Sequence, residues 1–264
     1  MRVRLEAFDM FCSSSGAGPP IVLIHGFPLD HTMWQPQVDE LSKDHMVSTL
    51  DLRGHGQSQA TPGPYSMDLL AGDVNMLLDH LGLGQVVLGG LSMGGYVAFA
   101  FFRKYQQRVR ALILVDTRAE ADTPEAKARR EQQAQAVLKD GPGNLVNQMI
   151  VKMFTQKTIL NDMTLVERVR KMMESTSSVG IVGALQGMAQ RPDSTLLLES
   201  IRVPTLIIVG SEDSLTTVSD AQRMADRIPG SELVIVPEAA HLTTLEKPRE
   251  VNAAVRRFLR RVSL

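Results

Sequence analysis

The 264-residue chain is long enough for one large α/β domain or two small ones, and 44% apolar residues can bury a substantial core. Its 28 basic and 29 acidic residues give a net charge of -1, which excludes a broad basic surface for nucleic acid and favours a small-molecule partner. No signal peptide or membrane-spanning apolar run is present, so we expect a cytoplasmic protein without a membrane partner. Cys12 is the only cysteine, which excludes an internal disulfide and a cysteine zinc cluster.

Short apolar runs alternate with helical patterns along most of the chain. Each run ends in polar or glycine residues, which is typical of a parallel sheet covered by helices on both faces. Residues 3–8 also look like a strand, and we expect them to add an antiparallel edge hairpin. The predicted parallel strands are 21–25, 45–51, 85–90, 109–116, 204–210 and 232–237.

This alternation stops between residues 118 and 191, where apolar residues recur at helical spacing and no convincing strand is found. Thr123 and Pro124 are typical of a helix start, and the glycines at 141 and 143 of a stop. We therefore predict a core domain of residues 1–117 and 192–264, with a helical cap at 118–191. A last helix over 248–261 carries four arginines, which we interpret as a solvated face.

The segment around Ser92 breaks sharply between a predicted strand and a predicted helix. Residues 90–94 fit the pattern G-x-S-x-G, in which glycines two positions either side relieve a strained turn that exposes the serine hydroxyl. Flanking Gly89 and Gly95 are expected to allow close packing beside the turn. The segment contains neither the lysine of a Walker loop nor the spacing of a dinucleotide loop. Ser92 is therefore a candidate nucleophile.

A serine nucleophile needs a base, and the base needs an acid to orient it. His241 follows the last predicted strand by one loop, whereas His31, His45, His55 and His80 are interpreted as structural. Two acids precede His241 at strand ends. Asp213 gives the chain order Ser, Asp, His and is the first candidate, Asp116 is the second, and neighbouring Glu212 is expected to be solvated.

The reaction places negative charge on the carbonyl oxygen, and we expect two backbone amides to stabilise this oxyanion. One is the N–H of Met93, directly after the candidate nucleophile. The other is the N–H of Phe27, in the loop after the strand at 21–25, where Pro28 stiffens the chain.

Five segments, in family order and spacing, make the sequence resemble the α/β-hydrolase superfamily. They are HGFPLDHTMW (25–34), DLRGHGQS (51–58), GGLSMGGYVAF (89–99), VGSEDSLTT (209–217) and AAHLTTLEKP (239–248). Two positions depart from the family pattern: Ala240 stands where a glycine usually precedes the histidine, and Val218 where a proline is usual.

The resemblance implies an α/β fold with a mostly parallel eight-stranded sheet flanked by helices, and a helical lid inserted after the sixth strand. It implies that Ser92 is the nucleophile, Asp213 the acid and His241 the base, with Phe27 and Met93 as oxyanion donors. It also makes Asp51, Arg53, Gly54 and Gly56 structural turn residues. The chain is most similar to small esterases, 3-oxoadipate enol-lactonases and cofactor-free haloperoxidases or perhydrolases.

A serine at the nucleophile position excludes dehalogenases and epoxide hydrolases, which use an aspartate there. We predict a serine carboxylic-ester hydrolase that needs no metal or cofactor. The methionine-rich lid favours a neutral pocket and small uncharged esters or lactones. Three alternatives remain open: a perhydrolase or haloperoxidase, a C–C bond hydrolase, and a non-catalytic ligand receptor. The oligomeric state is not predicted.

Overall fold

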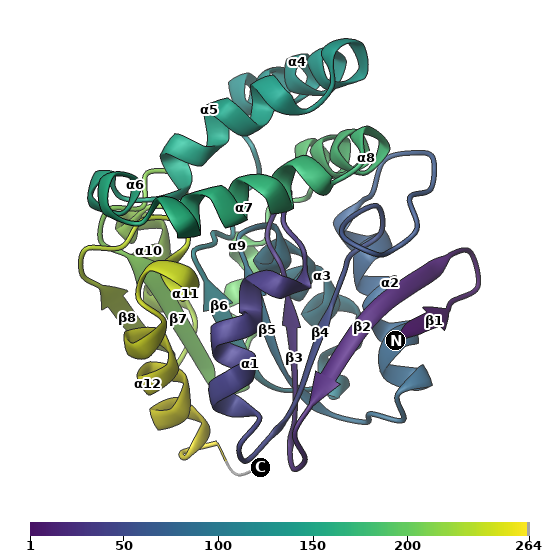
Figure 1. Cartoon of the computed structure of the whole chain (residues 1–264). Coiled ribbons are helices and arrows are strands. Elements are labelled where there is room, and N and C mark those ends of the chain that lie inside the picture. The colour runs from purple at the N-terminus through teal and green to yellow at the C-terminus, as the bar shows by residue number, and fades with distance from the viewer. Residues whose placement is uncertain (263–264) are drawn as a thin grey trace.

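A computed structural model of the protein describes residues 1–262 and places eight strands in one sheet of order β1-β2-β4-β3-β5-β6-β7-β8 (Figure 1). The strands from β3 to β8 are parallel, whereas β1 and β2 pair antiparallel at one edge. The predicted eight-stranded, mostly parallel sheet is confirmed. The strands are β1 Arg2–Arg4, β2 Asp9–Ser15, β3 Pro20–Ile24, β4 Met46–Leu50, β5 Val86–Leu91, β6 Val109–Val115, β7 Thr205–Gly210 and β8 Glu232–Val236.

The N-terminal hairpin forms, but its strands differ from the predicted strand at 3–8. Leu5 donates to the Phe8 carbonyl at 3.0 Å, which closes a turn in the middle of the predicted strand. Val3 then pairs with Met10, and Cys12 pairs with Leu50 of β4. The alternation of buried and exposed residues stops at Leu5, because Glu6 and Ala7 are both exposed in the turn before buried Phe8.

Helices cover both faces of the sheet, and the sheet separates the hydrophobic core into two clusters. Neighbouring strand residues point to opposite faces: Leu88 packs with α2, α3 and α10, whereas Val87 packs with α1 and α12. The helices and 3-10 turns of this part are η1 His31–Trp34, α1 Gln35–Leu41, α2 Met67–His80, α3 Met93–Tyr105, η2 Gln106–Arg108, α9 Thr195–Leu198, α10 Val218–Arg227, α11 Thr243–Glu246 and α12 Pro248–Leu259.

The last helix ends at Leu259, slightly before the predicted end at 261. Arg256 pairs with Glu40 and Asp44, and Arg257 and Arg261 pair with Glu232. Three of the four arginines at the end of the chain therefore form surface ion pairs and Arg260 is exposed, in agreement with the interpretation as a solvated face.

Five of the six helices between β6 and β7 form a layer that covers the carboxyl ends of the strands, as Figure 1 shows. Thr123 caps the first of them, and the chain leaves it at Gly141 with φ of 77°, as the sequence predicts. These helices are α4 Pro124–Asp140, α5 Gly143–Met153, α6 Gln156–Asn161, α7 Met163–Ser175 and α8 Ser178–Ala189. No helix within residues 1–262 is long and apolar enough to cross a membrane.

Helix α8 fixes this layer to the rest of the molecule through its small residues. A Cβ on Gly180 would lie 1.9 Å from the Gly54 carbonyl oxygen, and one on Gly187 would lie 1.7 Å from that of Tyr65. Tyr65 also donates its N–H to the Gly183 carbonyl at 2.8 Å. Only glycine permits this approach, so the small residues of α8 serve close packing rather than an open space.

Candidate active site

Ser92 lies in a tight turn between β5, which ends at Leu91, and α3, which begins at Met93. Its backbone has φ of 53° and ψ of −113°, an uncommon conformation for a residue with a side chain. A Cβ on Gly90 would lie 2.3 Å from the Gly94 carbonyl carbon, and one on Gly94 would lie 2.2 Å from the Ile24 carbonyl oxygen. The two glycines allow the turn, as predicted.

The outer glycines of the segment pack closely beside the turn. A Cβ on Gly89 would lie 2.6 Å from Leu23, and one on Gly95 would lie 2.3 Å from the Thr117 hydroxyl. That hydroxyl donates to the Ser92 carbonyl at 2.8 Å.

We expect Gly90→Ala to destabilise the protein by about 3 kcal/mol or more, because the added methyl group meets backbone that cannot move away. Chemical denaturation monitored by circular dichroism measures the change. Gly72→Ala is the matched control: Gly72 lies inside α2 with no atom within 4 Å of an added Cβ, so this variant gains about 0.5–1 kcal/mol. Equal stabilities for the two variants would contradict the packing argument.

Ser92, His241 and Asp213 are brought together in one hydrogen-bonded chain. The Ser92 Oγ lies 2.9 Å from His241 Nε2, and His241 Nδ1 lies 2.8 Å from Asp213 Oδ2. His241 follows β8 and Asp213 follows β7, so both reach Ser92 from the carboxyl edge of the sheet. With Nδ1–H donating to Asp213, Nε2 is free to accept the serine proton.

Asp213 is held as a carboxylate by the loop that carries it. Its Oδ1 accepts from the N–H groups of Leu215 and Thr216 at 2.8 and 3.0 Å, and its Oδ2 accepts from the Thr216 hydroxyl at 2.7 Å. Burial opposes ionisation, but the charge of His241 and these hydrogen bonds outweigh it and lower the pKa of Asp213. Thr216 is a supporting residue that the sequence analysis missed.

The second candidate acid, Asp116, is buried nearby and makes a different set of contacts. Its Oδ2 accepts from the Thr243 hydroxyl at 2.7 Å, and its Oδ1 accepts from the Gly210 N–H at 3.1 Å. Burial, and then the charge of Asp213, raise the pKa of Asp116 well above its usual value. Asp116 thus joins the loops after β7 and β8, while Asp213 takes the position beside His241. Glu212 is exposed, as expected.

The loop that carries His241 is also tied to the lid. Glu246 accepts from the Ala240 N–H at 2.7 Å through one carboxylate oxygen, and from the N–H and hydroxyl of Thr155 at 2.9 Å through the other. The alanine at 240 therefore leaves His241 well placed.

At the other departure from the family pattern, Val218 begins α10 behind a capping box formed by Thr217 and Asp220, so the helix starts without proline.

The predicted oxyanion donors, Phe27 and Met93, lie beside Ser92. A Cβ on Gly26 would be 3.4 Å from the Ser92 Cβ, which shows how closely the loop after β3 approaches the turn. Neither the Phe27 nor the Met93 amide has a hydrogen-bond partner within residues 1–262. Buried His25 fixes this loop, because its Nδ1 lies 2.8 Å from the Gly26 carbonyl and its Nε2 accepts from the Leu52 N–H.

A cavity of about 400 Å³ opens above Ser92, with Phe27 and His241 in its floor and helices α4 and α5 as its upper wall. Met149, Met153 and Met188 supply apolar surface from the lid. The expectation of a neutral pocket is wrong, because four basic side chains and no acidic one line the cavity in the described part of the chain. The basic residues are Arg118, Arg129, Arg130 and Lys152.

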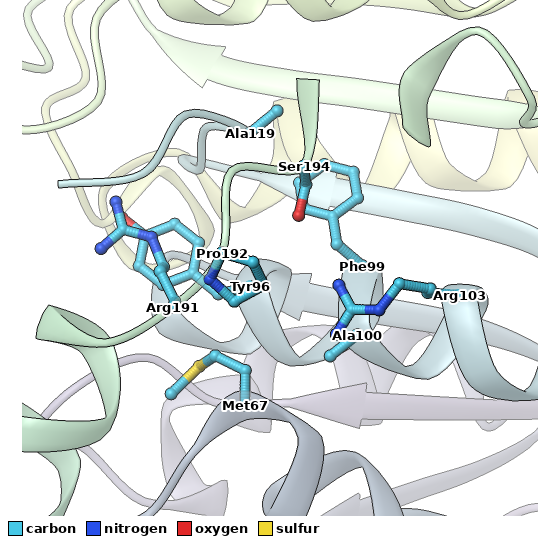
Figure 2. Close-up of a pocket in the computed structure, with 9 residues that line it drawn as sticks. All are labelled: Met67, Tyr96, Phe99, Ala100, Arg103, Ala119, Arg191, Pro192 and Ser194. Atoms are coloured by element: carbon cyan, nitrogen blue, oxygen red, sulfur yellow. The ribbon is translucent and has the colours of Figure 1, made fainter. Parts of the chain in front are cut away.

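The sequence pattern could not show this charge, since Arg129 and Arg130 lie within α4, which is polar over most of its length, and Arg118 lies in the segment before it. A second, much smaller cavity of about 10 Å³ adjoins Tyr96 and Arg191 and has room for about one water molecule (Figure 2). The Arg191 guanidinium lies 4.1 Å from the centre of the Tyr96 ring. Because Tyr96 also lines the larger cavity, this contact supports a wall of the candidate site and offers no room for a substrate itself.

Comparisons with known proteins agree with this architecture. A family model described as alpha/beta hydrolase fold matches residues 19–248. The 3-oxoadipate enol-lactonase 2 of Acinetobacter baylyi is 30% identical over 92% of this chain and 89% of its own. The structure of a thermophilic esterase from Thermogutta terrifontis, with malate bound, is 44% identical and superposes with a TM-score of 0.97 over all of both chains.

The enol-lactonase from Burkholderia xenovorans LB400 is 28% identical, with a TM-score of 0.93 over 98% of this chain and all of its own. The two solved structures share the fold with this chain over their full length, and the three relatives are named as an esterase and as enol-lactonases. The chain therefore belongs to the α/β-hydrolase fold family, as a hydrolase of the carboxylesterase and lactonase type.

Proposed function

We propose that the chain cleaves carboxylic esters or lactones with Ser92 as nucleophile, His241 as general base and Asp213 as the acid that orients the histidine. The observation that carries the proposal is the hydrogen-bonded chain from Ser92 through His241 to Asp213 in the floor of the large cavity. We also propose that residues 118–191 act as a cap over this cavity, since α4 and α5 form its upper wall.

The reaction proceeds through an acyl-enzyme. His241 takes the Ser92 proton as the serine oxygen attacks the carbonyl carbon, and the amides of Phe27 and Met93 hold the resulting oxyanion. The imidazolium then protonates the leaving alcohol as the C–O bond breaks. Water, deprotonated by the same histidine, attacks the acyl-enzyme and releases the acid. Every proton is carried by this chain or by water, so the scheme requires no metal or cofactor.

The test combines a panel of 4-nitrophenyl esters and lactones of graded acyl length with a serine-reactive phosphonate probe. We expect ester turnover, and we expect the probe to modify the peptide that contains Ser92, as identified by mass spectrometry. The panel is also run with hydrogen peroxide, since peroxide-dependent oxidation exceeding hydrolysis would favour a perhydrolase. Absent turnover and labelling would favour a ligand receptor, and labelling without ester turnover a C–C bond hydrolase.

The proposed base predicts the direction of the pH dependence. His241 must be neutral to accept the serine proton, so kcat/KM falls on the acid side as the histidine is protonated. Burial disfavours the imidazolium, but the charge and hydrogen bond of Asp213 outweigh it and raise the pKa of His241 above the usual 6.5. We expect the acid limb for an uncharged ester to have its midpoint above pH 6.5. A midpoint below that value would contradict the pairing.

A further inference from the structure

The basic side chains at and beside the active-site cavity outnumber the acidic side chains that pair with them. Asp122 is buried and pairs with Arg130 and with Arg191, the latter at 2.8 Å, while Arg118 approaches it at 3.6 Å. One carboxylate therefore serves three guanidinium groups. A further acidic residue near Arg118, Asp220, is itself paired with Arg223.

Two of the lining cations have no partner at all in the described chain. Arg129 and Lys152 make no ion pair or hydrogen bond within residues 1–262. The Nε of Arg118 is buried and likewise has no hydrogen-bond partner in that part of the protein. The buried Arg118 Nε loses its hydration without replacement, and the exposed side chains of Arg129 and Lys152 add positive charge beside it, so this wall is suited to an anionic group.

The two unpartnered cations stand on α4 and α5, the adjacent helices that form the upper wall of the cavity. Arg129 and Gln133 are four residues apart on α4, and Gln148 and Lys152 are four residues apart on α5, so each pair shares a helix face. Another cavity, of about 240 Å³, lies between these helices and shares the lining residues Arg129, Gln133 and Gln148 with the active-site cavity. The two cations therefore line the same cavity as Ser92, on the side formed by the lid helices.

We propose that the cavity selects esters or lactones that carry a carboxylate remote from the scissile bond, and that Arg129 and Lys152 bind this carboxylate with Arg118 as a third donor. This inference rests on the proposed function and names its substrate class. It replaces the expectation of uncharged substrates. The chain as a whole has a net charge of only -1, so the cations gathered here are a property of the cavity and not of a basic protein.

The test compares two esters of similar shape, the mono-4-nitrophenyl ester of adipic acid and 4-nitrophenyl 6-methylheptanoate, in which a branched alkyl end replaces the carboxylate. We expect kcat/KM to be about tenfold higher for the adipate ester at low ionic strength. The ratio of the two values should fall as sodium chloride is added, because salt screens partly exposed charges. A ratio of one or less would overturn the proposal.

The variants Arg129→Met and Lys152→Met each should lower this ratio by about five- to tenfold, mainly through KM. Lys139→Met is the matched control, because Lys139 is an exposed cation of α4 outside the cavity. An equal fall in the control, or an unchanged ratio in both cavity variants, would refute the subsite. Hydrolysis of the uncharged ester that disappears in Ser92→Ala would still support the serine mechanism, so the two proposals fail separately.

Discussion

Ser92→Ala is expected to lower kcat/KM for a 4-nitrophenyl ester by at least about 10⁴-fold. Alanine removes the Oγ that lies 2.9 Å from His241 Nε2, so no acyl-enzyme can form. The amides of Phe27 and Met93 and the cavity remain, and they sustain only residual catalysis. Initial rates across the pH range, together with loss of phosphonate labelling, measure the effect.

The fold of this variant should be retained, because alanine meets the same backbone geometry as serine at this position. Ser200→Ala is the matched control, since Ser200 is exposed and its hydroxyl donates to the Leu197 carbonyl, outside the site. It should keep full activity. A Ser92→Ala protein that kept more than about a tenth of wild-type activity, with preparations checked for contamination, would rule out the serine mechanism.

The turn around Ser92 could be predicted because its causes are local. A glycine two residues before and two after the serine, between an apolar strand and an apolar helix, specifies the geometry within a short stretch of chain. The order of Asp213 and His241 after successive strands was also sufficient to place both at one edge of the sheet.

The charge of the cavity could not be predicted because its causes are not local. Arg129 is an exposed residue of a polar helix and Lys152 an exposed residue of an amphipathic one, and their meeting in one cavity depends on how α4 and α5 pack over the core. That packing depends on α8, whose glycines fit against the chain near Gly54 and Tyr65. The tie between Glu246 and Thr155 likewise spans 91 positions and has no motif.

Sequence position alone also could not decide whether Asp116 or Asp213 is the acid that pairs with His241. Asp116 and Asp213 both follow parallel strands, and β6 and β7 are neighbours, so sequence position places both carboxylates near His241. Their contacts distinguish them. Asp213 accepts from His241 Nδ1, while both oxygens of Asp116 are taken by backbone and hydroxyl donors of the adjoining loops.

Substituting each acid by asparagine separates these roles. In Asp213→Asn, an amide NH₂ facing His241 Nδ1 favours the tautomer that carries its proton on Nε2, and this tautomer cannot accept the serine proton. We expect kcat to fall by about 10⁴-fold, with the protein still folded. The measurement is kcat for an uncharged ester, with unfolding followed in parallel to detect any loss of stability.

Asp116→Asn should instead keep kcat within about tenfold of wild type. Burial and the charge of Asp213 raise the pKa of Asp116 well above its usual value. A raised pKa favours the protonated carboxyl, and asparagine resembles this neutral form. Asparagine leaves one donor of Gly210 or Thr243 facing an NH₂ group, which costs stability on the order of 1–3 kcal/mol. A loss of about 10⁴-fold in Asp116→Asn, with Asp213→Asn nearly active, would assign the acid to Asp116. The opposite pattern follows from the geometry, because Asp213, and not Asp116, is the carboxylate hydrogen-bonded to the imidazole that must hold the positive charge.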